Sequence, residues 1–189
     1  MAQEGLLLDK GPFCSYNVTV DNMIKINVAE IKKSLVGSES FQYTLTAKDL
    51  DISPEDGDLT GPIQVEGTLA NGGDVLLLTA RETFTYRGSC ARCLKPVQLD
   101  LEAHVEERYY PEGTEGLEDD AFTYKFDVVD VTDALRESLL LAIPARVLCK
   151  PDCKGICPVC GCDRNVTECH CNDHAIDPRW QKLEALLKK

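Results

Sequence analysis

Residues 149–171 read CKPDCKGICPVCGCDRNVTECHC and hold seven of the ten cysteines of the chain. Thiols at this density form disulfides, work as a redox couple or bind a metal ion. Residues 1–22 lack the basic start and sustained apolar core of a secretory signal, so we expect a cytoplasmic protein. In a reducing compartment, closely spaced cysteines are more often metal ligands or redox centres than disulfides. Zinc is therefore the leading hypothesis for this stretch.

The second half of the stretch has the spacing of a complete zinc site. Residues 157–161 form the knuckle CPVCG, in which the proline stiffens the turn and the glycine lets the backbone fold back towards the sulfurs. The pair of cysteines at 169 and 171 returns nine residues later. We predict one compact four-thiolate site, formed by Cys157, Cys160, Cys169 and Cys171.

The first half of the stretch leaves two thiols, Cys149 and Cys153, without local partners. The other close pair in the chain is Cys90 and Cys93, in the motif CARC. Two thiolates separated by two residues on a tight turn can both reach one metal ion at about 2.3 Å. We assign these four cysteines to a second zinc site, which would tie residues 90–93 to the tail. Four thiolates would leave no open coordination position in either site. We therefore expect two structural zinc ions and no catalytic one.

Other ligands and another chemistry remain open. Cys162, His170 and His174 lie close enough in sequence to compete for the second half of the stretch, although we treat all three as non-ligands. A thioredoxin-like redox pair needs its CxxC at the start of a helix, whereas Lys95, Pro96 and a strand-like run follow Cys93. Thiol redox chemistry at Cys90 and Cys93 is therefore the weaker alternative.

Ahead of the cysteine-rich tail, apolar residues alternate with polar ones as in β-strands. The alternation starts at Ile24, Ile26 and Val28, runs into a short helical pattern at Ile31 and Leu35, and continues through residues 41–110. An Asn-Gly-Gly turn signal at 71–73 joins two of the runs. In the run 97–106 the odd-numbered positions are apolar and the even ones polar, His104 among them. This predicts an antiparallel meander with one buried face.

Residues 111–144 predict a loop, a short strand and a helix. The loop 111–121 is acidic, which is typical of a solvated loop and would also suit a docking surface for a basic partner. A short strand at 122–126 precedes a helix with Asp130 as N-cap, Leu135, Leu139 and Ala142 on one face, and Pro144 as its end. A second amphipathic helix, with a net charge of +3, is predicted from residue 178 onward.

These patterns predict an α+β fold. We expect an antiparallel, partly barrel-like sheet with one packed helix and a ribbon-like zinc-binding tail. The expected domains are an extension at 1–22 that carries Cys14, a β-rich α+β domain at 23–148 and the tail at 149–189. The longest apolar runs are too short for a membrane span.

The charge of the chain limits its partners. The formal net charge is −12, and eight thiolates with two zinc ions would bring it to about −16. This argues against a simple electrostatic RNA binder and favours a basic protein partner. Local contact with RNA would have to come from the basic cluster after residue 178, or from Arg92 and Lys95.

Four segments carry a resemblance to a known family. SCARCLKPV (89–97), LLLAIP (139–144), LCKPDCKGICPVCG (148–161) and DPRWQKLEAL (177–186) resemble the bacterial YceD family, also called the large ribosomal RNA subunit accumulation protein. The resemblance runs from about residue 23 to 187.

The resemblance implies a non-enzymatic role in 23S ribosomal RNA accumulation and in biogenesis of the large ribosomal subunit. It implies a large-subunit precursor as partner, or a small basic ribosomal protein whose gene often lies beside that of the family member. It also implies cysteine at the eight predicted ligand positions, while position 162 is usually not cysteine in the family. The alternatives are a thiol redox protein and a zinc-ribbon nucleic-acid-binding module.

Overall fold

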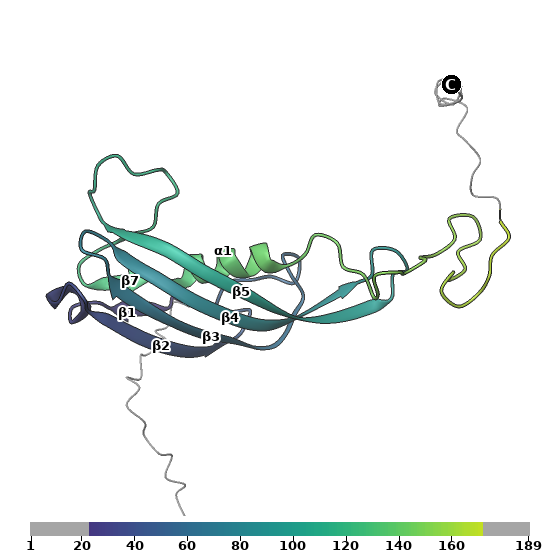
Figure 1. Cartoon of the computed structure of the whole chain (residues 1–189), viewed down its shortest axis with the longest axis horizontal. Coiled ribbons are helices and arrows are strands. Elements are labelled where there is room, and N and C mark those ends of the chain that lie inside the picture. The colour runs from purple at the N-terminus through teal and green to yellow at the C-terminus, as the bar shows by residue number, and fades with distance from the viewer. Residues whose placement is uncertain (1–22, 172–189) are drawn as a thin grey trace, which may run out of the picture. The chain divides into compact units, whose positions relative to one another are not determined.

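The computed structural model describes residues 23–171 (Figure 1). The predictions for residues 1–22, for His174 and for the helix and basic cluster after residue 178 lie outside the described residues. The helical elements are η1 (Ile31–Lys33) and α1 (Thr132–Ala142). The strands are β1 (Lys25–Asn27), β2 (Ser38–Leu45), β3 (Leu59–Asn71), β4 (Leu76–Ser89), β5 (Pro96–Pro111), β6 (Thr123–Tyr124) and β7 (Val128–Asp130). The predicted α+β class is confirmed.

The chain divides into two compact units. One comprises residues 23–87 and 98–144, and will be called the sheet unit; the other comprises residues 88–97 and 145–171, and will be called the cysteine unit. The predicted domain limits at 22 and 148 stay predictions. Neither helix in residues 23–171 has the length and apolar character needed to span a bilayer.

The main sheet has the strand order β2-β3-β4-β5-β6. β2 pairs antiparallel with β3, and β3 with β4, so the predicted meander is confirmed. The short β6 instead runs parallel to β5, with Tyr110 opposite Thr123. Since β2 and β6 remain as edges, the described strands form an open sheet and not a closed barrel.

The alternation in sequence becomes the two faces of this sheet. In β5, Ala103, Val105 and Tyr109 are buried, while Glu102 and His104 on the opposite face are exposed, with His104 Nε2 2.9 Å from Glu102 Oε1. His104 is thus a solvent-facing residue, as predicted. Only one face of the sheet is apolar, and that face needs a cover.

The predicted turn at 71–73 connects β3 to β4. The side-chain Oδ1 of Asn71 accepts a hydrogen bond from the backbone N–H of Gly73 at 2.9 Å, and Gly73 has a φ of +96°. Asn71 also donates from Nδ2 to the carbonyl of Ser34 at 2.9 Å. This hydrogen bond joins the segment that follows η1 to the end of β3. The helical pattern expected at Ile31 and Leu35 is only the single turn η1, and Leu35 lies beyond it with 80% of its surface exposed.

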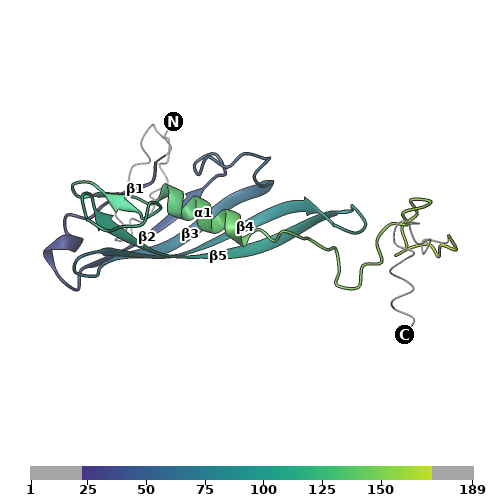
Figure 2. The same ribbon diagram turned by 90° about the horizontal axis from the view of Figure 1, so that it is seen from above.

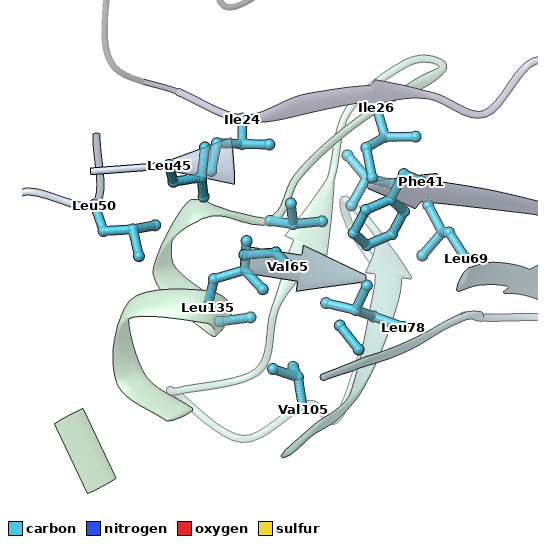
Figure 3. Packing of buried hydrophobic residues seen from close by; sticks show 14 of the residues in the cluster. Ile24, Ile26, Phe41, Leu45, Leu50, Val65, Leu69, Leu78, Val105 and Leu135 are labelled. Atoms are coloured by element: carbon cyan, nitrogen blue, oxygen red, sulfur yellow. The ribbon is translucent and has the colours of Figure 1, made fainter. Parts of the chain in front are cut away.

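A second layer covers the apolar face. Helix α1 runs along the strands over one face of the sheet (Figure 2), and β1 pairs antiparallel with β7, placing Ile26 opposite Val129. Figure 3 shows side chains from both layers meeting in one core. The labelled members of this core are Ile24, Ile26, Phe41, Leu45, Leu50, Val65, Leu69, Leu78, Val105 and Leu135.

Helix α1 starts one residue later than expected. The N-cap is Val131, and no side chain caps it, so the prediction of Asp130 as N-cap is wrong. Asp130 still accepts the backbone N–H of Thr132 at 3.0 Å, because its short side chain folds back on the turn that precedes the helix. The helix ends before Pro144, as predicted, and Leu135 and Leu139 are fully buried.

One buried position under α1 carries an ionisable side chain. Glu82 of β4 is 0% exposed, and Ser138 of the helix donates a hydrogen bond to Glu82 Oε2 at 2.5 Å. Burial raises the pKa of the carboxyl group to about 7, and the bond from Ser138 offsets only part of this. Periodicity alone places an apolar residue here, so this acid is a feature that only the structure reveals.

Candidate metal centres

The first cysteine pair lies on the hairpin turn between β4, which ends at Ser89, and β5, which begins at Pro96. The backbone N–H of Cys90 donates to the carbonyl of Lys95 at 2.8 Å, and the N–H of Leu94 donates to the carbonyl of Cys90 at 2.9 Å. Leu94 takes a φ of +61°, which closes the turn tightly. The CxxC therefore sits on a hairpin turn, as predicted, and not at a helix start.

Backbone hydrogen bonds within the cysteine unit hold the tail against this turn. The N–H of Ala91 donates to the carbonyl of Val147 at 2.8 Å, and the N–H of Ile156 donates to the carbonyl of Arg92 at 3.0 Å. The Arg92 guanidinium adds a bond from Nη1 to the carbonyl of Cys153 at 2.8 Å. Segments more than fifty residues apart in sequence are thereby brought together.

The first tetrad is formed where these two segments meet. Its four Sγ atoms lie within 4.8 Å of one another, and belong to Cys90, Cys93, Cys149 and Cys153. The Cys90–Cys153 and Cys93–Cys149 sulfur distances are 3.8 and 3.6 Å. A tetrahedral zinc ion with bonds of about 2.3 Å needs sulfurs about 3.8 Å apart. Three of the thiols are buried, and the side chains of Val97 and Leu148 pack against them.

The second tetrad is built on the CPVCG knuckle. Its sulfurs also lie within 4.8 Å of one another, and the Cys160–Cys169 and Cys157–Cys169 distances are 3.5 and 3.4 Å. The N–H of Gly161 donates to the carbonyl of Cys157 at 2.9 Å, with Gly161 at a φ of +72°. The members are Cys157, Cys160, Cys169 and Cys171, the same four that the sequence groups together.

Polar side chains outside the tetrads donate to the sulfurs. Asn165 donates from Nδ2 to Cys153 Sγ at 3.4 Å and accepts the backbone N–H of Lys154 at 2.9 Å. Arg164 donates from Nη2 to Cys157 Sγ at 3.7 Å. Such donors stabilise negative charge on a thiolate and fix its orientation. Sequence reasoning missed both residues, because nothing except their position between the cysteines marks them.

An ion pair stabilises the same loop. Lys95, on the hairpin turn, lies 2.6 Å from an Asp163 carboxylate oxygen. This contact lowers the pKa of Asp163 to about 2, with help from the backbone N–H of Asn165. Lys95 is therefore already paired within the cysteine unit, which weakens it as a local RNA contact.

Each tetrad contains two thiols whose pKa is lowered, Cys90 and Cys153 in the first and Cys157 and Cys160 in the second. Burial disfavours the thiolate of Cys90, but hydrogen bonds from three backbone N–H groups outweigh it and lower the pKa to about 6. Backbone N–H groups of Cys160 and Val159 lower the pKa of Cys157 to about 6 as well. By contrast, contact with the Cys93 sulfur raises the pKa of Cys149 to about 12. In each tetrad, metal binding would displace the protons that remain on the thiols.

The eight predicted ligands therefore come together in the two predicted groups, and the donor set suits zinc. Two of the residues that we treated as non-ligands, Cys162 and His170, are described by the structure and belong to neither tetrad. Cys162 lies next to the second tetrad, His170 is exposed and belongs to neither group, and none of the nine described cysteines is in a disulfide. The role of the eight thiols as ligands remains a prediction.

The chain is similar in sequence to one known protein family and to proteins of several bacteria. The family described as large ribosomal RNA subunit accumulation protein YceD matches residues 78–187. An uncharacterized protein of Mycobacterium tuberculosis is 35% identical over 104 residues, 53% of this chain and 50% of that protein. The uncharacterized protein YlbN of Bacillus subtilis is 28% identical over 159 residues, 80% of this chain and 90% of that protein.

An uncharacterized protein of Mycobacterium leprae is 26% identical over 130 residues, 67% of this chain and 59% of that protein. The chain thus spans about half the length of the Mycobacterium tuberculosis relative that it matches. No solved structure matches the chain.

Proposed function

The chain belongs to the YceD family, the large ribosomal RNA subunit accumulation proteins, and we propose that it supports 23S ribosomal RNA accumulation and large-subunit biogenesis as a non-enzymatic factor of the cytoplasm. The family match over residues 78–187 carries this proposal. A role in accumulation of the large subunit follows from the family description, while the partner and the mechanism are our inference.

We further propose that each tetrad binds a structural zinc ion. The sulfur separations of 3.4 to 3.8 Å support this, because they lie near those that a four-thiolate zinc site requires. A bound zinc ion would cross-link segments that share very little apolar surface, and so stabilise the cysteine unit. Four thiolates leave no open coordination position for substrate or water, which supports a role without catalysis.

The redox alternative has little support. A low-pKa thiol at a helix start is what thioredoxin-like chemistry uses, whereas Cys90 and Cys93 lie on a hairpin turn and share their surroundings with Cys149 and Cys153. The nucleic-acid-binding alternative is limited by charge, since the chain as a whole carries −12.

The partner that we propose is a basic ribosomal protein, alone or on a large-subunit precursor. The sheet unit carries 23 acidic and 9 basic residues, a net charge of −14. Negative potential of this size attracts basic partners and speeds their association. It also repels the phosphate backbone of RNA, so direct contact between the sheet unit and rRNA is disfavoured.

A groove in the sheet unit is the part of this surface that suits a basic segment best. It has a volume of about 610 Å³ and is formed where β5, the acidic loop and α1 approach one another. Tyr110, Leu117 and Phe122 line it with apolar atoms. Its carboxylates form no ion pair with any described residue, and they belong to Glu106, Glu107, Glu118, Asp120 and Glu137.

Gradient sedimentation of cell lysates tests the function. We expect the protein in fractions of large-subunit precursors, with loss of this association after RNase treatment, and a lowered amount of 23S rRNA when the gene is deleted. Absence from every precursor fraction, together with unchanged 23S rRNA in the deletion strain, would refute the ribosomal role.

Charge reversal tests the groove. The double substitution Glu118→Lys/Asp120→Lys should weaken association with precursor fractions, because it turns attraction for a basic partner into repulsion. Glu55→Lys/Asp74→Lys is the matched control, since it makes the same change in net charge at exposed acids outside the groove. Equal sedimentation of the two variants would exclude the groove as the docking surface.

A further inference from the structure

A short loop of the cysteine unit contacts both tetrads. It comprises residues 163–165, will be called the linking loop, and lies in sequence between the second and third cysteines of the second tetrad. Asn165 donates from Nδ2 to the Cys153 sulfur of the first tetrad at 3.4 Å. Its neighbour Arg164 donates from Nη2 to the Cys157 sulfur of the second tetrad at 3.7 Å. Two consecutive side chains thus reach one sulfur of each tetrad.

Backbone contacts hold the linking loop against the residues that separate the tetrads. Only residues 154–156 lie between the last cysteine of the first tetrad and the first cysteine of the second. The backbone N–H of Arg164 donates to the carbonyl of Gly155 at 3.0 Å, and Asp163 forms a β-bridge with Ile156. The loop and this three-residue connection are therefore ordered together.

Asn165 uses both ends of its side-chain amide in this arrangement. Its Oδ1 accepts the backbone N–H of Lys154 at 2.9 Å. Its Nδ2 donates to Asp163 Oδ1 at 2.8 Å as well as to the Cys153 sulfur. A carboxylate in its place could still accept from Lys154 but could not donate to the sulfur, and it would face a thiolate with a charge of the same sign.

The linking loop is also bound to the hairpin turn. Lys95 lies 2.6 Å from Asp163 Oδ2, and it follows Cys93 of the first tetrad by two residues. The loop therefore contacts both of the segments that supply sulfurs to the first tetrad, while its own two ends lead to cysteines of the second.

We propose that the linking loop couples the two zinc sites, so that zinc in one tetrad raises the affinity of the other for zinc. This inference rests on the proposed zinc binding and adds to it. Residues 154–156 and 163–165 must be ordered for either site. The site that forms first orders them, so the other site then forms with a smaller loss of conformational entropy. By linkage, the effect has the same size in both directions.

Asn165 is the positioning residue of this coupling. Closure of the second tetrad fixes the loop and places the Asn165 amide beside the Cys153 sulfur, where its N–H stabilises the negative charge of a thiolate ligand. In the other direction, the Cys153 thiolate holds the amide, and with it the loop, in the conformation that the second tetrad needs. Loss of such a donor typically lowers metal affinity about 10- to 100-fold. We therefore expect coupling of about tenfold.

Stepwise zinc affinities test the coupling. The reduced protein is titrated with zinc in competition with a chelator of known affinity, and native mass spectrometry counts the bound ions. Cys171→Ala leaves only the first site and Cys149→Ala only the second, and both variants keep the sulfur that Asn165 contacts. The association constant of the wild type for both ions together should exceed the product of the two single-site constants by about tenfold.

Substitution of Asn165 should abolish the coupling. Asn165→Asp, made in the wild type and in both single-site variants, should leave the two affinities independent of each other. Asn165→Ala removes the amide without adding a charge and should do the same. Thr167→Asp is the matched control, because it adds the same charge at an exposed position two residues away and should keep the coupling. Far-UV circular dichroism checks that every variant retains the folded sheet unit.

Three results would overturn the proposal. The first is independent binding of the two ions by the wild type, and the second is coupling that survives in both Asn165 variants. The third is an equal loss of coupling in Thr167→Asp, which would trace the effect to charge and not to the amide contact. A wild type that binds no zinc would instead refute the zinc part of the proposed function.

Discussion

At the scale of single residues, Glu82 is the clearest departure from the apolar pattern of the sheet. Its carboxylate faces the core, and only one of its two oxygens has a hydrogen-bond partner among the described residues, the hydroxyl of Ser138. Because its folded-state pKa is raised from 4.5 to about 7, the folded protein binds a proton that the unfolded chain releases. The resulting stabilisation is complete below pH 4.5 and is lost as the pH rises through 7.

Glu82→Gln should remove this pH dependence while keeping the bond to Ser138. At pH 8 the variant should be more stable than the wild type by about 3 kcal/mol, and the gain should shrink towards zero at pH 4.5. Urea unfolding followed by far-UV circular dichroism at several pH values measures the difference. Glu66→Gln on the solvent-facing side of β3 is the control. A gain that does not change with pH would contradict the buried, protonated state.

Gly155 is the residue on which the approach of the tail to the hairpin turn depends. It has a φ of +75°, and a Cβ there would lie 2.9 Å from the carbonyl oxygen of Arg92, the acceptor for Ile156. Gly161 has nearly the same φ, with open space around its Cβ position. Only the first of the two therefore combines backbone strain with a steric clash.

Gly155→Ala should lower the thermal unfolding midpoint more than Gly161→Ala. The alanine at 161 meets only the cost of a left-handed backbone, about 1 kcal/mol, whereas the alanine at 155 must also push the Arg92 carbonyl away. Scanning calorimetry of the zinc-loaded proteins gives the comparison. Equal shifts in the two variants would mean that the close contact adds nothing to stability.

At the scale of elements, α1 stabilises the sheet unit through one face only. Leu139 is fully buried against the sheet, while Leu141, two residues later, is 86% exposed. Leu139→Ala should reduce the free energy of unfolding by about 3 kcal/mol, since it removes buried methyl groups and leaves a cavity. Leu141→Ala should change it by less than about 0.5 kcal/mol. Denaturant unfolding tests both, and similar losses would contradict the packing of the helix.

At the scale of the whole molecule, the two units differ in what stabilises them. The sheet unit has an extensive apolar core, whereas the buried cluster of the cysteine unit consists of Cys90, Cys93 and Cys153, with Val97 and Leu148 against it. So small a cluster cannot offset the entropy of ordering the tail, and zinc would supply the difference. The units should therefore respond differently when metal is removed.

Chelation should unfold the cysteine unit and leave the sheet unit folded. We expect the backbone amides of Ala91 and Ile156 to lose protection from hydrogen exchange, while β2 and β3 keep theirs. Acidification should act in the same way, because protons compete with the metal ion for the thiolates. Exchange measured by mass spectrometry checks this, and uniform loss of protection in both units would refute it.

Elements with a strong local signal were predictable from the sequence alone. Strict alternation in β5 and the turn residues at 71–73 predicted strands and a hairpin, because side chains of a strand alternate between faces and such turns need residues that tolerate positive φ. The spacing of the cysteines also predicted which sulfurs would meet. Two cysteines on a short knuckle have few other thiols within reach. The spacing of the cysteines along the chain was therefore sufficient to predict the two groups.

Contacts that join distant segments could be seen only in the folded structure. The pairing of β1 with β7 across about a hundred residues, the parallel β6, and the burial of Glu82 under Ser138 have no local signature. The same is true of Asn165 and Arg164 beside the sulfurs. These contacts depend on how the two layers and the tail pack, and packing free energy is shared among many residues that no short stretch of sequence contains.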